Sequence, residues 1–132
     1  FNLNINNILT ALTCRKYGWD IKSAIVGDNV VAKTIRSSVS ARDFNLKSEI
    51  DYFDALVSIS ETSNLLDREH RIDALKWNWL EENTFFSSFS IEKVLSFWLR
   101  CELMHRWDNL TMEEGAEIFR QMINDLKKDV KF

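Results

Sequence analysis

Apolar residues recur every three or four positions along most of the chain, and this spacing predicts helices. Ile5, Ile8, Leu9 and Leu12 follow it in the first segment, which predicts a helix with one apolar face over residues 2–17. Later segments repeat the pattern, and the alternation typical of a β-strand is nowhere sustained. We therefore expect an all-α protein, a compact bundle of about six to seven helices.

Glycine and short polar residues mark where these helices end and begin. Gly18 and Gly27 are predicted stops, because glycine readily adopts the left-handed conformation that ends helices. Asp20 is predicted to cap a short helical turn over residues 21–26. The helices predicted further along cover about residues 29–35, 48–60, 66–85, 91–107 and 111–127.

Three of the later helices begin at recognisable capping residues. Asp28 is predicted to cap the helix through Ile35, and Ser90 the helix that starts at position 91. Thr111 with Glu114 forms a capping box, which predicts the start of the last helix. The polar segments 37–45 and 61–64 are the predicted loops.

The segment 91–107 is the most apolar of the predicted helices. Its apolar residues occupy two neighbouring faces: Ile91, Val94, Leu95 and Trp98 on one, and Phe97, Cys101, Met104 and Trp107 on the other. Because a helix that is apolar over so much of its girth is usually buried, we expect this helix at the centre of the bundle.

Length and composition favour one globular domain over residues 1–132. Apolar residues make up 45% of the chain, which argues against disorder. The net charge is −3, which would repel the phosphates of a nucleic acid and argues against such a partner. No stretch approaches the roughly 18 apolar residues of a membrane span. Cys14 and Cys101 suit a reducing, cytoplasmic compartment. Because the chain lacks an initiator Met, we expect it to be a fragment of a longer protein.

Trp77 and Trp79 lie two residues apart and therefore point to different sides of their helix. Trp79 shares a stripe with Ile72 and Leu75, which predicts that it faces a core. Trp77 is then either covered by a second helix or available to a protein partner, since exposed aromatic residues commonly mark interfaces. The residues predicted to contact a partner are Trp77, Glu81 and Glu82.

Carboxylate and histidine pairs raise the possibility of a metal site. Asp67 with His70, and Glu102 with His105, each lie one helical turn apart, as in di-iron bundles. An antiparallel hairpin of helices 66–85 and 91–107 would put both histidines at one level. One acid is Asp, however, and the first helix lacks an acid before Asp20. We therefore expect structural or solvent-facing histidines, with no metal and no cofactor.

Catalytic motifs are also missing from the sequence. It contains no Gly-rich phosphate loop, no Gly-x-Ser-x-Gly, no His-Glu-x-x-His and no Cys-x-x-Cys. Cys101 and His105 supply only two zinc ligands, and burial on an apolar helix would disfavour a thiolate nucleophile. We expect the protein not to be an enzyme.

Some segments of the sequence are more specific than a general helical pattern. FNLNINNILTALTCRKYGWDI together with LKWNWLEENTFF is similar to an uncharacterised bacterial family whose genes accompany those of V-type ATP synthases. FSIEKVLSFWLRCE resembles a motif in the C/d subunit of A/V-type ATPases, which is named d in eukaryotes. The positions that match this motif are Phe89, Ile91, Glu92, Val94, Leu95 and Glu102. The family's Pro and Gly around the Phe are replaced by Ser88 and Ser90.

The resemblance implies a non-catalytic, all-helical subunit or accessory protein. Such a protein would couple the central stalk to the membrane rotor ring through protein contacts. It would be cytoplasmic and associated with the membrane only through its partners, without inserting into it. Two alternatives remain open: a free-standing helical interaction or regulatory module, and a small metal-dependent enzyme built on Asp67, His70, Glu102 and His105.

Overall fold

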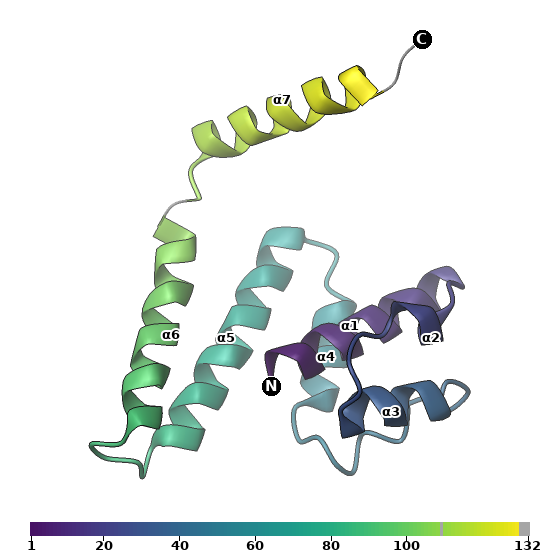
Figure 1. Cartoon of the computed structure of the whole chain (residues 1–132), viewed down its shortest axis with the longest axis vertical. Helices are drawn as coiled ribbons and strands as arrows, with labels where there is room; N and C mark the ends of the chain where they lie inside the picture. Colours follow the sequence, from purple (N-terminus) through teal and green to yellow (C-terminus); the bar gives the residue numbers. More distant parts are fainter. Residues whose placement is uncertain (109, 130–132) are drawn as a thin grey trace. The chain divides into compact units, whose positions relative to one another are not determined.

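The computed structural model describes residues 1–108 and 110–129, and every regular element in these ranges is a helix (Figure 1). This confirms the predicted all-α class. The helices are α1 (Asn2–Tyr17), α2 (Ile21–Ala24), α3 (Val30–Ser37), α4 (Phe53–Ser60), α5 (Leu65–Thr84), α6 (Ile91–Asp108) and α7 (Met112–Asp129).

The chain divides by its packing into two compact units, Phe1–Lys76 and Trp77–Phe132. We call them the N-terminal unit and the C-terminal unit. The boundary falls inside α5, so this one helix contributes to both. The expectation of a single domain over the whole chain stays a prediction.

The end of α1 is set by Gly18, as predicted. This residue has φ 70°, and the N–H of Trp19 donates to the Cys14 carbonyl at 2.8 Å, which closes the last helical turn. Asp20 caps α2 by accepting a bond from the Lys22 N–H. The predicted extent of α2 to residue 26 is wrong.

The early end of α2 has a cause in α1. The buried amide side chain of Asn7 donates to the Val26 carbonyl at 2.8 Å and accepts from the Val26 N–H at 3.1 Å. Both backbone groups of Val26 are thereby satisfied outside a helix, and Ile25 before it is extended. A buried amide that replaces the helical bonds of the backbone favours the extended form.

The cap of α3 also differs from the prediction. Asn29, not Asp28, accepts the Ala32 N–H at 2.8 Å and begins the helix. Asp28 instead forms an exposed ion pair with Arg36 at 3.1 Å. Both residue types are good caps, so the sequence could not decide between neighbours.

Residues 48–52 form turns, and the helix predicted from residue 48 begins only at Phe53. The preceding loop is anchored by Phe44, which is fully buried and has a left-handed φ of 51°. The Arg15 guanidinium lies 3.7 Å from the centre of the Phe44 ring and donates to the carbonyls of Val39 and Ala41. Tertiary anchoring thus overrides the local helical pattern here.

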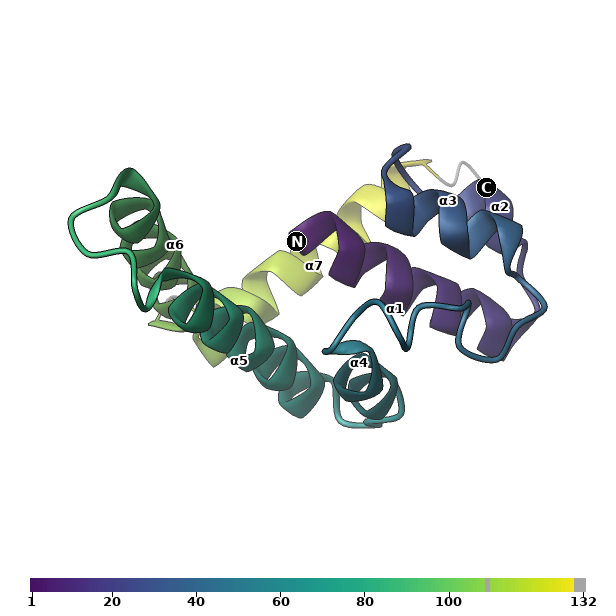
Figure 2. The same ribbon diagram turned by 90° about the horizontal axis from the view of Figure 1, so that it is seen from below.

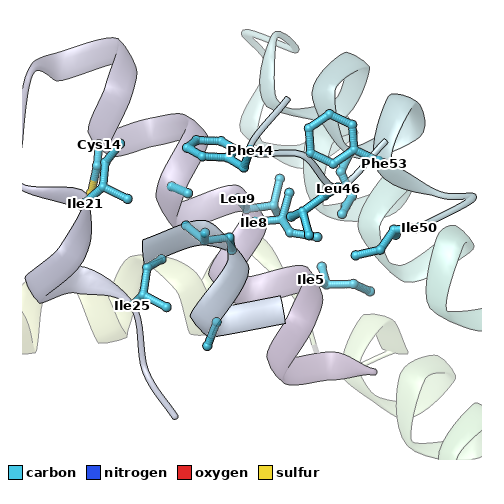
Figure 3. Close-up of a cluster of buried hydrophobic side chains, with 14 of the residues drawn as sticks. Ile5, Ile8, Leu9, Cys14, Ile21, Ile25, Phe44, Leu46, Ile50 and Phe53 are labelled. Carbon is cyan, nitrogen blue, oxygen red and sulfur yellow. The ribbon is translucent and has the colours of Figure 1, made fainter. Parts of the chain in front are cut away.

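The core of the N-terminal unit is built around α1, which contacts α2, α3 and α4 (Figure 2). Ile5 and Ile8 are completely buried, as the spacing predicted. Phe44, Leu46 and Phe53 pack over the same face from the loop and α4 (Figure 3). Each large side chain buried in this way contributes about 1.5–3 kcal/mol.

The helices of the C-terminal unit begin at the predicted caps. The Ser90 hydroxyl accepts the Lys93 N–H at 3.3 Å, and the Thr111 hydroxyl accepts the Glu114 N–H at 3.3 Å. Among the helices in the described ranges, none combines the length and the apolar character needed to cross a bilayer.

Candidate functional site

The last turns of α5 and the helix α6 form an antiparallel hairpin within the C-terminal unit (Figure 1). On α5, contacts with α6 come from the Trp77 ring, the Leu80 carbonyl and Thr84, spaced by three and four positions. On α6 they come from Lys93, Ser96 and Arg100, spaced by three and four positions as well. Helical residues at such steps share one face, so each helix presents one stripe to the other.

Hydrogen bonds between polar groups hold the hairpin together. The hydroxyls of Thr84 and Ser96 lie 3.2 Å apart, and they lie 2.7 Å and 3.3 Å from the Leu80 carbonyl. The Lys93 ammonium donates to the Thr84 carbonyl at 3.1 Å. Thr84 and Ser96 are both buried. Lys93, Ser96 and Arg100 therefore form a polar stripe of α6 that contacts α5.

Trp77 completes the contact at the other end of the hairpin. The Arg100 guanidinium lies 5.1 Å from the centre of the Trp77 ring, within the range of a cation–π contact. Trp77 is half-buried. Helix α6 therefore covers one part of the Trp77 side chain, and the other part is open to solvent.

Trp79 is likewise half-buried, and Ile72 on its predicted stripe is buried in the core of the N-terminal unit. Glu81 and Glu82 are exposed on α5. The structure thus leaves both carboxylates accessible, and contact of Trp77, Glu81 and Glu82 with a partner stays a prediction.

Six of the apolar side chains of α6 are exposed to solvent. Those of Phe97, Trp98 and Val94 are 62%, 56% and 67% exposed. The expectation that α6 is the buried centre of a bundle is therefore wrong. Its physical reason is that polar residues of α6 occupy contacts with α5. Most of the two apolar faces is therefore exposed, although Cys101 and Trp107 are half-buried. The exposed apolar residues of α6 are Ile91, Val94, Leu95, Phe97, Trp98 and Met104.

The turn before α6 extends this apolar surface. Phe89 is fully exposed and has a left-handed φ of 58°, a conformation that disfavours residues with a Cβ. Phe86 is 91% exposed, and its ring meets that of Phe85 edge to face at 4.9 Å. Large aromatic side chains at the tip of a hairpin are costly to hydrate and are therefore typical of contact surfaces.

Helix α7 carries a second exposed apolar face. Its large exposed residues, Met112, Ile118, Phe119 and Met122, recur at the spacing of one helical face. Its first turn is acidic, with Glu113 and Glu114. We refer to the exposed apolar residues of the turn, α6 and α7 together as the apolar surface of the C-terminal unit.

The Glu92 carboxylate lies in the first turn of α6. Hydrogen bonds from its own backbone N–H and from the Ser90 side chain lower its pKa. This is the arrangement expected of an acid at a helix N-terminus, where unpaired N–H groups favour negative charge. It explains why a carboxylate follows the cap, and it calls for no catalytic role.

The candidate metal ligands do not form a site within the described ranges. There, no group of three or more His, Cys, Asp or Glu residues is placed to hold a metal ion. His70 and His105 are exposed, in α5 and α6. The metal-enzyme alternative therefore has no ligand group among these residues.

Sequence reasoning missed the polar stripe of α6, although the spacing of Lys93, Ser96 and Arg100 was available. It identified the apolar residues of the segment and took them for core. The available signal was a polar stripe beside two apolar faces on the same helix. This pattern alone does not tell which of the faces contacts a neighbouring helix.

Comparison with known protein families identifies one family for this chain. The model described as "Protein of unknown function (DUF2764)" matches residues 1–130. The chain belongs to this family. No curated protein and no solved structure matches it.

Proposed function

We propose that this DUF2764 protein is a non-catalytic helical subunit that binds other proteins through the apolar surface of its C-terminal unit. The observation that carries the proposal is the orientation of α6. Lys93, Ser96 and Arg100 contact α5, whereas six of the large apolar residues of α6 are exposed. A hairpin that only needed to fold would bury the apolar face, because apolar burial is the main source of stability.

The free energy available from burying the exposed apolar side chains of α6 favours a protein interface. Burying an exposed Leu, Phe or Met side chain is worth about 1.5–3 kcal/mol, and α6 alone exposes six large apolar residues. Contiguous exposed apolar patches of this kind are uncommon on monomers and mark interaction sites.

A helical protein surface suits this face better than a lipid surface. The first turn of α7 is acidic, and α6 exposes Glu92 and Glu102 against one exposed arginine, Arg106. Anionic lipid repels such charges, whereas lipid-binding helices carry Lys and Arg on their polar flanks.

We further propose that the partners belong to a V-type ATP synthase, namely its central stalk and its rotor ring. The resemblance to the C/d subunit supports this assignment. Four of the matching positions, Phe89, Ile91, Val94 and Leu95, are also among the exposed apolar residues. The protein would then couple stalk and ring by contacts alone, at the cytoplasmic side of the membrane and peripheral to it.

The test is a pull-down from native membranes with the tagged protein and two variants. The double variant Phe97→Glu/Trp98→Glu places charges on the outward face of α6. The matched control is Val30→Glu on α3, since Val30 is 70% exposed but lies in the N-terminal unit. Circular dichroism checks that each variant keeps its helices.

We expect the wild type and Val30→Glu to recover stalk or ring proteins and the double variant to lose them. Consistent absence of these proteins from the wild-type sample would contradict the ATP synthase assignment. Recovery of other proteins, lost in the same variant, would favour the free-standing interaction module. Equal recovery by all three forms would contradict the role of α6.

The exposed carboxylates Glu81 and Glu82 allow a second variant at the predicted contact residues. Glu81→Lys/Glu82→Lys reverses two exposed charges on α5 beside the half-buried Trp77. If Trp77, Glu81 and Glu82 contact the partner, this variant recovers less of the partner protein than the wild type does. Added salt should lower recovery by the wild type as well, because exposed charges act mainly through long-range attraction that salt screens.

A further inference from the structure

The N-terminal unit contains an open hollow of about 470 Å³ between α1, the first half of α5 and the segment after Gly18. This volume lies within the range of small-molecule sites. From α1 it is lined by Asn6, Leu9, Thr10, Thr13 and Cys14, and from α5 by Arg68, Glu69, Ile72 and Lys76, with Trp19 and Ala24 completing the wall.

One part of this lining is apolar. Leu9, Cys14 and Ile72 are each less than one tenth exposed and belong to the buried core cluster. Trp19, in contrast, is 63% exposed and adds an accessible aromatic ring at the edge. An alkyl or aryl group of modest size can therefore be desolvated against this wall, which is the main source of affinity in most small-ligand sites.

The α5 side of the hollow carries two cations. The Lys76 side chain is only 21% exposed, and its ammonium lies 3.4 Å from Asp73, so its position is fixed. Arg68 is half-buried, and its Nε is shielded from solvent without a hydrogen-bond partner in the described part of the chain. A buried guanidinium N–H without an acceptor is unfavourable and calls for one.

Among the described residues of the lining, Glu69 is the one carboxylate, against the two cations. Lys76 is partly compensated by Asp73, which leaves Arg68 as the stronger anion-binding group. Arginine also offers its donors in a planar fork that matches a carboxylate or a phosphate.

We propose that this hollow binds an anion, a carboxylate or a phosphate ester, that carries a short apolar chain. The anionic group lies against Arg68, with Lys76 as a second cation, and the apolar chain lies against Leu9, Ile72 and Trp19. This inference does not depend on the proposed function, because it concerns a different unit and a different surface.

The experiment titrates the full chain with four compounds that share one alkyl chain: octanoate, octyl phosphate, octanol and octylammonium. Amide chemical shifts in two-dimensional NMR spectra report where each compound binds. We expect octanoate or octyl phosphate to shift the amides of Thr10, Thr13 and Ile72 and to bind at least tenfold more tightly than octanol or octylammonium. The tighter of the two anions identifies the preferred head group.

Two variants and one control test the role of the cations. Arg68→Gln should weaken binding of the anion about tenfold, the effect of losing a hydrogen bond to a charged group. Lys76→Gln should weaken it about threefold, because Asp73 already compensates this ammonium. Lys33→Gln removes an exposed charge on α3 that does not line the hollow, and should leave the affinity unchanged. Thermal melts check that each variant is folded. If Arg68→Gln does not fold, Lys76→Gln still tests the role of the cations.

Three results would overturn the inference: no binding of either anion at millimolar concentration, equal binding of octanoate and octylammonium, or shifts confined to α6 and α7. The last result would mean that the alkyl chain, not the anion, selects the site. None of these outcomes bears on the result of the pull-down. Each of the two proposals can therefore be contradicted without the other.

Discussion

Helix α1 in the N-terminal unit buries its apolar residues, whereas helix α6 in the C-terminal unit exposes them. Ile5 and Ile8 are 0% exposed, while Ile91 and Phe97 are 81% and 62% exposed. Among the described residues, every buried apolar side chain of the core cluster lies at or before Ile72. Similar apolar periodicity thus serves folding in one unit and, we propose, recognition in the other.

The difference lies in which stripe of each helix meets its neighbour. In α1 the apolar stripe packs against the loop residues Phe44 and Leu46. In α6 the neighbour is α5, and it receives Ser96 and Lys93. An exposed apolar face in a folded unit lowers solubility without adding stability, and for this reason we propose that a partner covers it.

The largest expected effect comes from truncating a buried ring. Phe44→Ala removes a fully buried side chain and the contact with Arg15, and should lower the free energy of unfolding by about 3–5 kcal/mol. Phe97→Ala in α6 should change it by no more than about 0.5 kcal/mol, because its ring is mostly hydrated already. Urea unfolding followed by circular dichroism measures both. Equal losses would remove the contrast between the two units.

A smaller effect is expected at the cap of α3. Asn29→Ala should cost the N-terminal unit about 1 kcal/mol, because it leaves the Ala32 N–H without its acceptor. Asp28→Ala should cost no more than about 0.5 kcal/mol, since its ion pair with Arg36 is exposed. The same unfolding experiment measures these values, and the reverse order would restore Asp28 as the cap.

Phe89 allows folding and recognition to be separated in the C-terminal unit. Phe89→Gly removes a fully exposed ring from a left-handed backbone position, and should raise stability by up to about 1 kcal/mol. If the ring is part of a docking surface, the same change weakens partner recovery. A variant that is less stable, or that is recovered with partners as well as the wild type, would speak against this separation.

The smallest effect is a pH dependence at the start of α6. The pKa of Glu92 is lowered by hydrogen bonds from its own N–H and from Ser90, so its stabilising contribution is complete above the pKa of the unfolded chain. That contribution is lost as the pH falls through the lower, folded-state pKa. In an NMR titration, Ser90→Ala should raise the pKa of Glu92 toward its ordinary value. No change on this substitution would rule out the Ser90 contribution.

The sequence predicted most of the elements because their ends depend on local chemistry. Gly18, Asp20, Ser90 and Thr111 act within one turn of the chain, and all four act as expected. The errors arise where distant groups decide. Asn7 ends α2 early through Val26, nineteen residues away in sequence.

The candidate site was harder to predict for the same reason. Periodicity shows that α6 has apolar faces, but it does not show which neighbour meets which face. The polar contact of Ser96 with Thr84 depends on how the hairpin pairs, and that pairing decides that Phe97 and Trp98 point outward.

Site-specific photo-crosslinking tests the central claim most directly. A photoreactive phenylalanine analogue is placed at position 97 on α6, and at position 33 on α3 as an exposed control in the N-terminal unit. After irradiation in intact cells, we expect position 97 to crosslink to a discrete protein, with stalk and rotor-ring proteins as the proposed products, and position 33 to give none. No crosslink from position 97, or the same products from both positions, would contradict the account.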